Sequence, residues 1–133
     1  MVKIILTLSI KLHEMKRTLI IGASANPSRY AYIATQRLIS YGHPVFLVGR
    51  KNGIVLGQEI QTEKIYYSDI HTVTLYINPT HQPDYYDYIV SLNPKRVIFN
   101  PGTENPDFEN ILSAINIIPI RACTLLLLSV GQY

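Results

Sequence analysis

The sequence contains no tryptophan and a single cysteine, Cys123, among its 133 residues. One cysteine cannot form an internal disulfide or supply a cysteine-based zinc site alone. Long apolar runs are also missing, because residues 4–10 and 125–128 are far too short to cross a bilayer. There is no dense basic run, zinc-finger motif or RNA-recognition motif, which argues against nucleic acid as a partner. We therefore expect a cytoplasmic protein with an ordinary apolar core, no metal site and no membrane partner.

The length of the chain fits one domain with one sizeable core. We expect residues 15–133 to form this single domain. Residues 1–14 read as an N-terminal extension, because a second methionine, Met15, stands just before the first strong strand. The apolar run in this extension is followed by His13 and Glu14, which make a poor cleavage site for a secretory signal.

Continuously apolar segments alternate with segments that have helical spacing. Buried strands are indicated for residues 18–22, 44–49, 73–78, 96–100 and 117–122, and short strand or hairpin pieces within residues 50–70. Helices are indicated for residues 29–41, 82–92, 108–115 and 124–130. The residues at helical spacing are Tyr30, Ile33, Ala34, Arg37, Leu38 and Tyr41 in the first helix, Tyr85, Tyr86, Ile89 and Leu92 in the second, and Phe108, Ile111, Leu112 and Ile115 in the third. This alternation predicts an α/β, three-layer Rossmann-type fold with a mostly parallel, doubly wound sheet.

In such sheets ligands bind outside the carboxyl ends of the strands, so the residues after each strand are candidates for a site. Three strand ends carry an Asn-Pro pair, namely Asn26-Pro27, Asn78-Pro79 and Asn100-Pro101. Two further pairs, Asn93-Pro94 and Asn105-Pro106, are read as turns or helix starts. For the pairs at the strand ends, a helix-start role and a role beside a ligand are compatible, because a helix N-terminus attracts anions.

The loop after the first strand offers several groups to a phosphate. Gly22 permits a tight turn, and Ser24 carries a hydroxyl and a backbone N–H. Arg29, at the start of the following helix, can pair with a phosphate through two hydrogen bonds. The same pattern also suits an ordinary tight turn between a strand and a helix.

The charges are distributed unevenly along the chain. Residues 1–58 hold eight basic residues and one acidic residue, whereas residues 59–133 hold four basic and eight acidic residues. The first half therefore either meets an anion or presents a solvated basic surface.

Two features expected of an NAD-binding site are missing. Only Gly22 of the three glycines in the dinucleotide fingerprint is present, and the acidic residue expected after the second strand is replaced by Gly49-Arg50-Lys51. Two cations at this position suit a phosphorylated ribose, such as the 3′-phosphate of coenzyme A or the 2′-phosphate of NADP. A solvated loop would also explain them.

The ordered set of motifs resembles the small stand-alone coenzyme A-binding domain proteins, which are similar to the N-terminal domain of the succinyl-CoA synthetase alpha subunit and of ADP-forming acyl-CoA synthetases. The resemblance covers residues 16–133 and rests on Leu19-Ile20-Ile21-Gly22-Ala23-Ser24, Asn26-Pro27-Ser28-Arg29-Tyr30, Tyr41-Gly42-His43-Pro44-Val45, Asn100-Pro101-Gly102, Pro106, Phe108-Glu109 and Arg121-Ala122-Cys123. Many relatives carry Asn-Pro after the second strand, where this chain has Gly49-Arg50.

The resemblance implies a coenzyme A site across the strand ends. Its contacts would come from Gly22, Ala23, Ser24, Asn26, Pro27, Arg29 and Tyr30 in the first loop, Gly49, Arg50 and Lys51 at the adenosine end, and Asn78, Pro79, Thr80, Asn100, Pro101 and Gly102 in the next two loops. Cys123, which follows the last strand, is read either as a buried apolar residue or as a thiol near the ligand.

We expect binding of coenzyme A or an acyl-CoA without catalytic turnover. The synthetase relatives use a phosphorylated histidine on a separate domain, and we expect no counterpart of that reaction here. No Ser–His–Asp order stands out. The alternatives are an NADP-dependent oxidoreductase and a regulatory protein that senses a nucleotide. A homodimer is left open.

Overall fold

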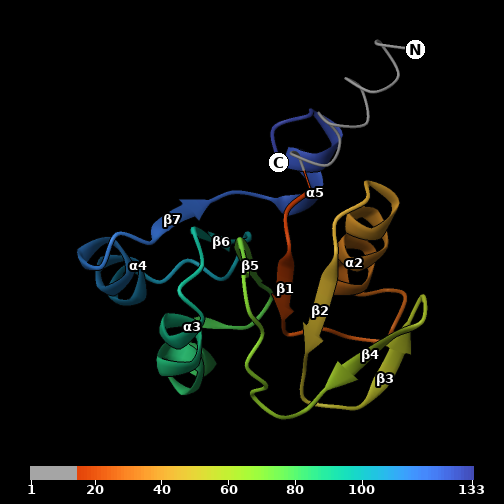
Figure 1. Cartoon of the computed structure of the whole chain (residues 1–133), viewed down its shortest axis with the longest axis horizontal. Coiled ribbons are helices and arrows are strands. Elements are labelled where there is room, and N and C mark those ends of the chain that lie inside the picture. Colours follow the sequence, from red (N-terminus) through yellow and green to blue (C-terminus); the bar gives the residue numbers. More distant parts are fainter. Residues whose placement is uncertain (1–14) are drawn as a thin grey trace.

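The computed structural model describes residues 15–133, and the expected N-terminal extension lies outside the described residues. Within these residues seven strands form one sheet in the order β3-β4-β2-β1-β5-β6-β7 (Figure 1). The strands are β1 (Thr18–Ile21), β2 (Val45–Val48), β3 (Gly53–Val55), β4 (Gln58–Gln61), β5 (Thr72–Leu75), β6 (Arg96–Phe99) and β7 (Ile118–Arg121). The helices are α2 (Tyr30–Ser40), the 3₁₀ helix η1 (Pro79–Tyr85), α3 (Tyr86–Leu92), α4 (Pro106–Ala114) and α5 (Thr124–Ser129). Of these helices, none has the length and apolar character needed to span a bilayer.

The sheet is parallel except at one edge, where β3 and β4 form an antiparallel hairpin. The hairpin turns at Leu56 and Gly57, whose φ angles of 48° and 80° suit a two-residue turn between twisted strands. Short strand pieces were predicted for this part of the chain, and the structure confirms them.

Helices cover both faces of the sheet (Figure 1). Leu19 and Ile21 of β1 belong to the core cluster that includes side chains of α3 and α4, whereas Ile20 belongs to the cluster that includes side chains of α2 and α5. This alternation follows from the pleat of a strand, which sends successive side chains to opposite faces. The fold is therefore the predicted three-layer, doubly wound Rossmann-type fold.

The buried face of α2 differs from the predicted one. Ala31, Ala34, Thr35 and Leu38 are buried, whereas Tyr30 and Tyr41 are 72% and 53% exposed. Small side chains bring α2 close to the sheet, and the two tyrosines lie at the ends of the helix, beyond that contact. The predicted end of the helix is confirmed: Gly42 has φ +87°, and His43 N–H donates to Leu38 O, as in a Schellman cap.

The segment predicted as one helix over residues 82–92 is divided in two. Residues 79–85 form the 3₁₀ helix η1, and the α-helix begins only at Tyr86. Pro83 lies inside η1, where it has no N–H to donate to a helical hydrogen bond. In α4, Phe108 and Leu112 are buried as expected, but Ile111 and Ile115 are 43% and 45% exposed.

The chain runs from the centre of the sheet to one edge and then returns to fill the other side. Strands β1 and β5 are neighbours at the point where the direction reverses. The loops after these two strands leave on opposite sides of the sheet, because α2 covers one face and α3 the other (Figure 1). A crevice for a ligand is therefore expected between the carboxyl ends of β1 and β5.

The end of the sheet opposite this crevice, at the amino ends of its strands, is closed by polar contacts around Tyr133. Its hydroxyl lies 2.6 Å from Thr18 Oγ1, and the Arg96 guanidinium lies 4.5 Å from its ring centre. His43 packs on the same ring and accepts a hydrogen bond from Lys16 N at its Nδ1. Burial, Lys16 and Arg96 together lower the pKa of His43 below its ordinary value.

Candidate functional site

A cavity of about 760 Å³ opens at the carboxyl ends of β1, β2, β5 and β6. Its volume lies within the range of roughly 300–1,000 Å³ typical of small-molecule sites. The lining residues are Gly22, Ala23, Ser24, Ala25, Asn26, Arg29, Tyr30, Ala31, Gly49, Arg50, Lys51, Asn52, Tyr76, Ile77, Asn78, His81, Tyr85, Pro101, Gly102 and Thr103. Twelve of the residues named from the sequence thus come together here, from four different loops.

The first wall of the cavity is the loop after β1. Gly22 has φ +89°, and a Cβ there would lie 2.7 Å from Tyr76 O, so this position requires glycine. The N–H groups of Gly22 and Ala23 both donate to Val48 O. These two N–H groups hold the loop against β2 and are not available to a ligand.

Asn26 shapes the rest of this loop. Its Oδ1 accepts hydrogen bonds from Ser28 N and Ser28 Oγ at 3.0 and 2.8 Å, so its side chain closes a turn and does not cap the helix. Helix α2 begins three residues after Pro27, with Arg29 as its N-cap residue and no side-chain acceptor on its first turn. Pro27 does not line the cavity. The N-terminus of α2 is left open to an anion, which its dipole would favour.

Three cations line the cavity at the β1–β2 side: Arg29, Arg50 and Lys51. All three are exposed, and none forms an ion pair within residues 15–133. Among the described residues that line the cavity, none is a carboxylate or a cysteine. Unpaired cations beside an uncapped helix N-terminus attract anions, and phosphate in particular suits arginine.

Gly49 joins this end of the cavity to the first loop. A Cβ at Gly49 would lie 2.4 Å from Ala23 O and 3.1 Å from Ile60 Cγ2. No larger residue fits without separating the two loops. Glycine here therefore allows Arg50 and Lys51 to follow β2 directly beside the loop after β1.

The second wall is the loop after β5. Asn78 lines the cavity, and its Oδ1 accepts from Thr80 N and Thr80 Oγ1 at 3.0 Å each, which caps η1. Pro79 and Thr80 belong to η1 and do not line the cavity.

The third wall is the loop after β6, where Pro101 and Gly102 line the cavity. Asn100 does not line it. Asn100 is 2% exposed, its Nδ2 donates to Thr74 Oγ1 and Leu75 O at 2.7 and 2.9 Å, and its Oδ1 accepts from Thr124 N at 2.9 Å. Its side chain therefore ties α5 to the end of β5.

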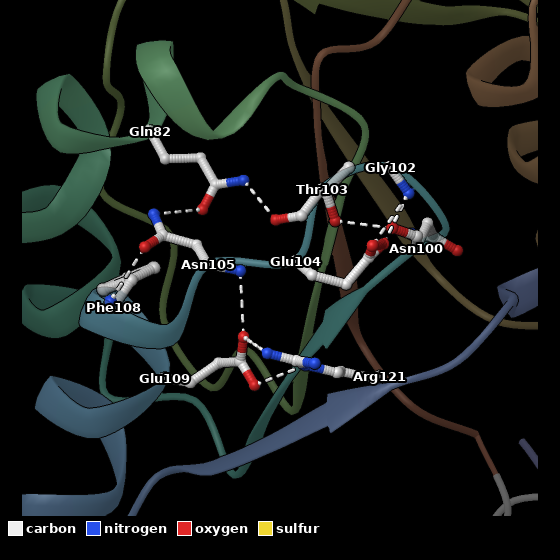
Figure 2. A network of polar contacts seen from close by, with 9 residues as sticks. All are labelled: Gln82, Asn100, Gly102, Thr103, Glu104, Asn105, Phe108, Glu109 and Arg121. Carbon is white, nitrogen blue, oxygen red and sulfur yellow. Dashed lines mark hydrogen bonds and ion pairs between the residues drawn. The ribbon is translucent and has the colours of Figure 1, made fainter.

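A network of polar contacts fixes this loop from behind (Figure 2). The buried Gln82 side chain donates to Thr103 O at 2.7 Å and accepts from Asn105 Nδ2 at 3.0 Å. Thr103 Oγ1 donates to Asn100 O at 2.7 Å. Asn105 in turn caps α4 as predicted, with its Oδ1 accepting from Phe108 N. The third wall is thus held rigidly against η1 and α4.

Several lining residues were not assigned to the site from the sequence. The strand β5 was expected to continue to Asn78, but it ends at Leu75, and two residues of the expected strand, Tyr76 and Ile77, line the cavity beside Asn78. The buried hydroxyl of Tyr76 has no hydrogen-bond partner within residues 15–133. Burial raises the pKa of Tyr76. The hydroxyls of Thr124 and Thr74 lie near enough to the Tyr76 hydroxyl to oppose this shift, although neither forms a hydrogen bond with it. The hydropathy of residues 73–78 does not reveal that the strand ends early.

His81 and Cys123 have different positions relative to the cavity. His81 lies in η1 and lines the cavity. Cys123 is the N-cap residue of α5, is partly exposed and does not line the cavity. Within residues 15–133, no group of three histidine, cysteine, aspartate or glutamate side chains is placed to hold a metal ion.

The fold and the site together define a Rossmann-type domain with a cation-lined cavity at the switch point of its sheet. The model of the CoA-binding domain family matches residues 16–129, and the chain belongs to this family. No functionally curated protein matches the sequence.

Solved structures extend this comparison. A crystal structure of a protein described as uncharacterized is 55% identical, with a TM-score of 0.88 over 90% of this chain and 98% of the other. A protein from Thermus thermophilus is 21% identical, with a TM-score of 0.78 over 96% of this chain and 97% of the other. A hypothetical protein from Pyrococcus horikoshii OT3 is 24% identical, with a TM-score of 0.78 over 90% of this chain and 86% of the other. The last two share the fold.

Proposed function

We propose that this protein binds coenzyme A or an acyl-CoA in the cavity at the strand ends and does so without catalytic turnover. Membership of the CoA-binding domain family supports coenzyme A as the ligand. The observation that carries the proposal is the set of three cations, Arg29, Arg50 and Lys51, around an open helix N-terminus. Among the residues that the structure describes, none of these cations forms an ion pair and no carboxylate lines the cavity. The compartment we propose is the reducing cytoplasm, where a single cysteine would stay a thiol.

The ligand would lie along the strand ends with its phosphates at the cationic side. Arg29, beside the N-terminus of α2, would contact the diphosphate. Arg50 and Lys51 would contact the 3′-phosphate of the ribose. The pantetheine arm would then run past β1 and β5 toward Gly102, where the lining residues carry no permanent charge.

The first test measures the contribution of Arg29 by isothermal titration calorimetry with coenzyme A. Loss of a charge-assisted contact in Arg29→Ala should weaken binding by about 1.5–3 kcal/mol, or roughly 10- to 150-fold. Arg37→Ala is the matched control, because Arg37 is an exposed arginine in the last turn of the same helix. An equal effect of the two substitutions would remove Arg29 from the site.

The second test asks whether Arg50 and Lys51 contact the 3′-phosphate. Coenzyme A and dephospho-coenzyme A are titrated into the wild type and into the double variant Arg50→Ala/Lys51→Ala. The wild type should prefer coenzyme A, and the double variant should lose this preference, because both ligands share every other group. A preference that survives in the variant would place the 3′-phosphate elsewhere.

A further inference from the structure

The two ends of the cavity differ in charge. The cations Arg29, Arg50 and Lys51 lie at the β1–β2 side, whereas the side after β6 is lined by Pro101, Gly102 and Thr103. If the phosphates occupy the cationic side, as in the proposed function, the thiol or acyl end of the ligand reaches the loop after β6. The charges around this loop then decide which acyl groups are accepted.

Glu104 places a carboxylate directly behind this wall. Its oxygens accept the Gly102 N–H at 2.5 and 3.2 Å, and Figure 2 shows the side chain folded back onto this loop. Gly102 itself lines the cavity. The Gly102 N–H, which could otherwise donate to a carbonyl or carboxylate of a ligand, therefore already donates to a negatively charged carboxylate.

The cation whose electrostatics involve Glu104 is paired with a different carboxylate. Arg121 donates to both oxygens of Glu109, at 2.9 and 3.1 Å, and its pKa is raised first by this hydrogen-bonded pair and only lastly by Glu104. A negative charge brought to Gly102 would thus meet the Glu104 carboxylate within a few ångströms.

We infer that Glu104 makes this site selective for free coenzyme A and for acyl-CoA esters with an uncharged acyl group, against esters whose acyl group ends in a carboxylate. The inference rests on the proposed function. An acyl carboxylate beside Gly102 would be repelled by the Glu104 carboxylate even if both are partly solvated. This repulsion weakens as salt is added. The discrimination is therefore electrostatic and sensitive to ionic strength.

The test compares malonyl-CoA with isovaleryl-CoA, in which an uncharged isopropyl group replaces the carboxylate at nearly the same size. Titrations of the wild type are run at low ionic strength and pH 8, where histidine side chains are ordinarily neutral. Isovaleryl-CoA should bind more tightly by about threefold or more. Tighter binding of malonyl-CoA would overturn the inference and would place the acyl end beside Arg50 and Lys51.

Glu104→Gln separates charge from apolar contact. Glutamine keeps an oxygen for the Gly102 N–H, so malonyl-CoA should gain affinity while isovaleryl-CoA stays unchanged. Glu59→Gln is the matched control, because Glu59 is an exposed glutamate of β4, near the other edge of the sheet, and it should change neither affinity. An unchanged ratio in Glu104→Gln would overturn the inference.

Three further outcomes complete the test. If Glu104→Gln does not fold, the wild type at high salt gives the same information, because screening should narrow the ratio and a constant ratio would refute the role of charge. If coenzyme A and both esters fail to bind the folded wild type, the proposed function itself is wrong. Binding of all three with equal affinity would refute the selectivity alone.

Discussion

Asn100 and Asn78 occupy equivalent places in the sequence, since each precedes a proline where a strand was expected to end, but their environments differ. The Asn100 side chain is buried and makes three hydrogen bonds, to Thr74, Leu75 and Thr124. A net contribution of about 0.5–1.5 kcal/mol for each bond predicts that Asn100→Ala lowers the free energy of unfolding by about 2–4 kcal/mol. Part of this loss arises because Leu75 O and Thr124 N remain buried without their partner.

Asn78→Ala is the matched comparison. Asn78 is exposed and caps a short 3₁₀ helix, so its replacement should cost about 0.5–1 kcal/mol. Both values are measured by urea unfolding followed by far-ultraviolet circular dichroism, because the chain has no tryptophan to report by fluorescence. An equal loss in the two variants, or a loss below about 1 kcal/mol for Asn100→Ala, would refute the distinction drawn from burial.

Three further predictions concern the packing and titration of single groups. In Gly49→Ala the new Cβ must move from 2.4 Å to beyond 3.4 Å from Ala23 O. The free energy of unfolding, measured in urea, should therefore fall by about 1–3 kcal/mol, and calorimetry should show weaker coenzyme A binding. Unchanged binding would mean that Gly49 does not shape the site. Burial and neighbouring cations lower the pKa values of His43 and His71 in the folded protein. As the pH falls below about 6.5, the unfolded chain therefore binds protons at these two histidines before the folded protein does. Unfolding measurements should therefore show lower stability at pH 5 than at pH 7.5, and the double variant His43→Asn/His71→Asn should show a flatter profile; a profile as steep as that of the wild type would refute this cause. Tyr76→Phe removes a buried hydroxyl that has no hydrogen-bond partner in the described part of the chain, so thermal unfolding should show unchanged or slightly raised stability. A clear loss of stability would mean that the hydroxyl is bonded.

The pH effect depends on the bonds that these histidines make. Thr72 Oγ1 accepts from Arg96 Nε at 2.9 Å and lies 2.8 Å from His71 Nδ1, so the threonine proton is available to that nitrogen. His43 Nδ1 likewise accepts from Lys16 N. Both histidines are therefore built into the fold in their neutral form, and protonation would remove an acceptor from each.

The order of strands and helices could be predicted because buried strands and amphipathic helices have different periodicities. The side of each helix that packs against the sheet was harder to predict. Tyr30 and Tyr41 have helical spacing with Leu38, yet they are exposed, because hydropathy does not reveal how far the contact with the sheet extends along a helix. The division at Pro83 could have been anticipated from proline chemistry alone.

The cationic part of the site could be predicted because Arg29, Arg50 and Lys51 immediately follow expected strands or loops. The roles of Asn78 and Asn100 could not be distinguished, because the difference lies in contacts with β5 and α5, which are far apart in the sequence. The contribution of Tyr76 and Ile77 was missed for a related reason: an apolar residue after the last ladder hydrogen bond has the same hydropathy as one inside the strand.

The central claim, that this cavity binds coenzyme A through its extra phosphate and its unpaired cations, is tested most directly by titrating coenzyme A and NAD into the wild type under the same buffer and salt. Coenzyme A should bind more tightly than NAD, and this advantage should shrink as ionic strength rises. Tighter binding of NAD, or no binding of coenzyme A to the folded protein, would contradict the claim.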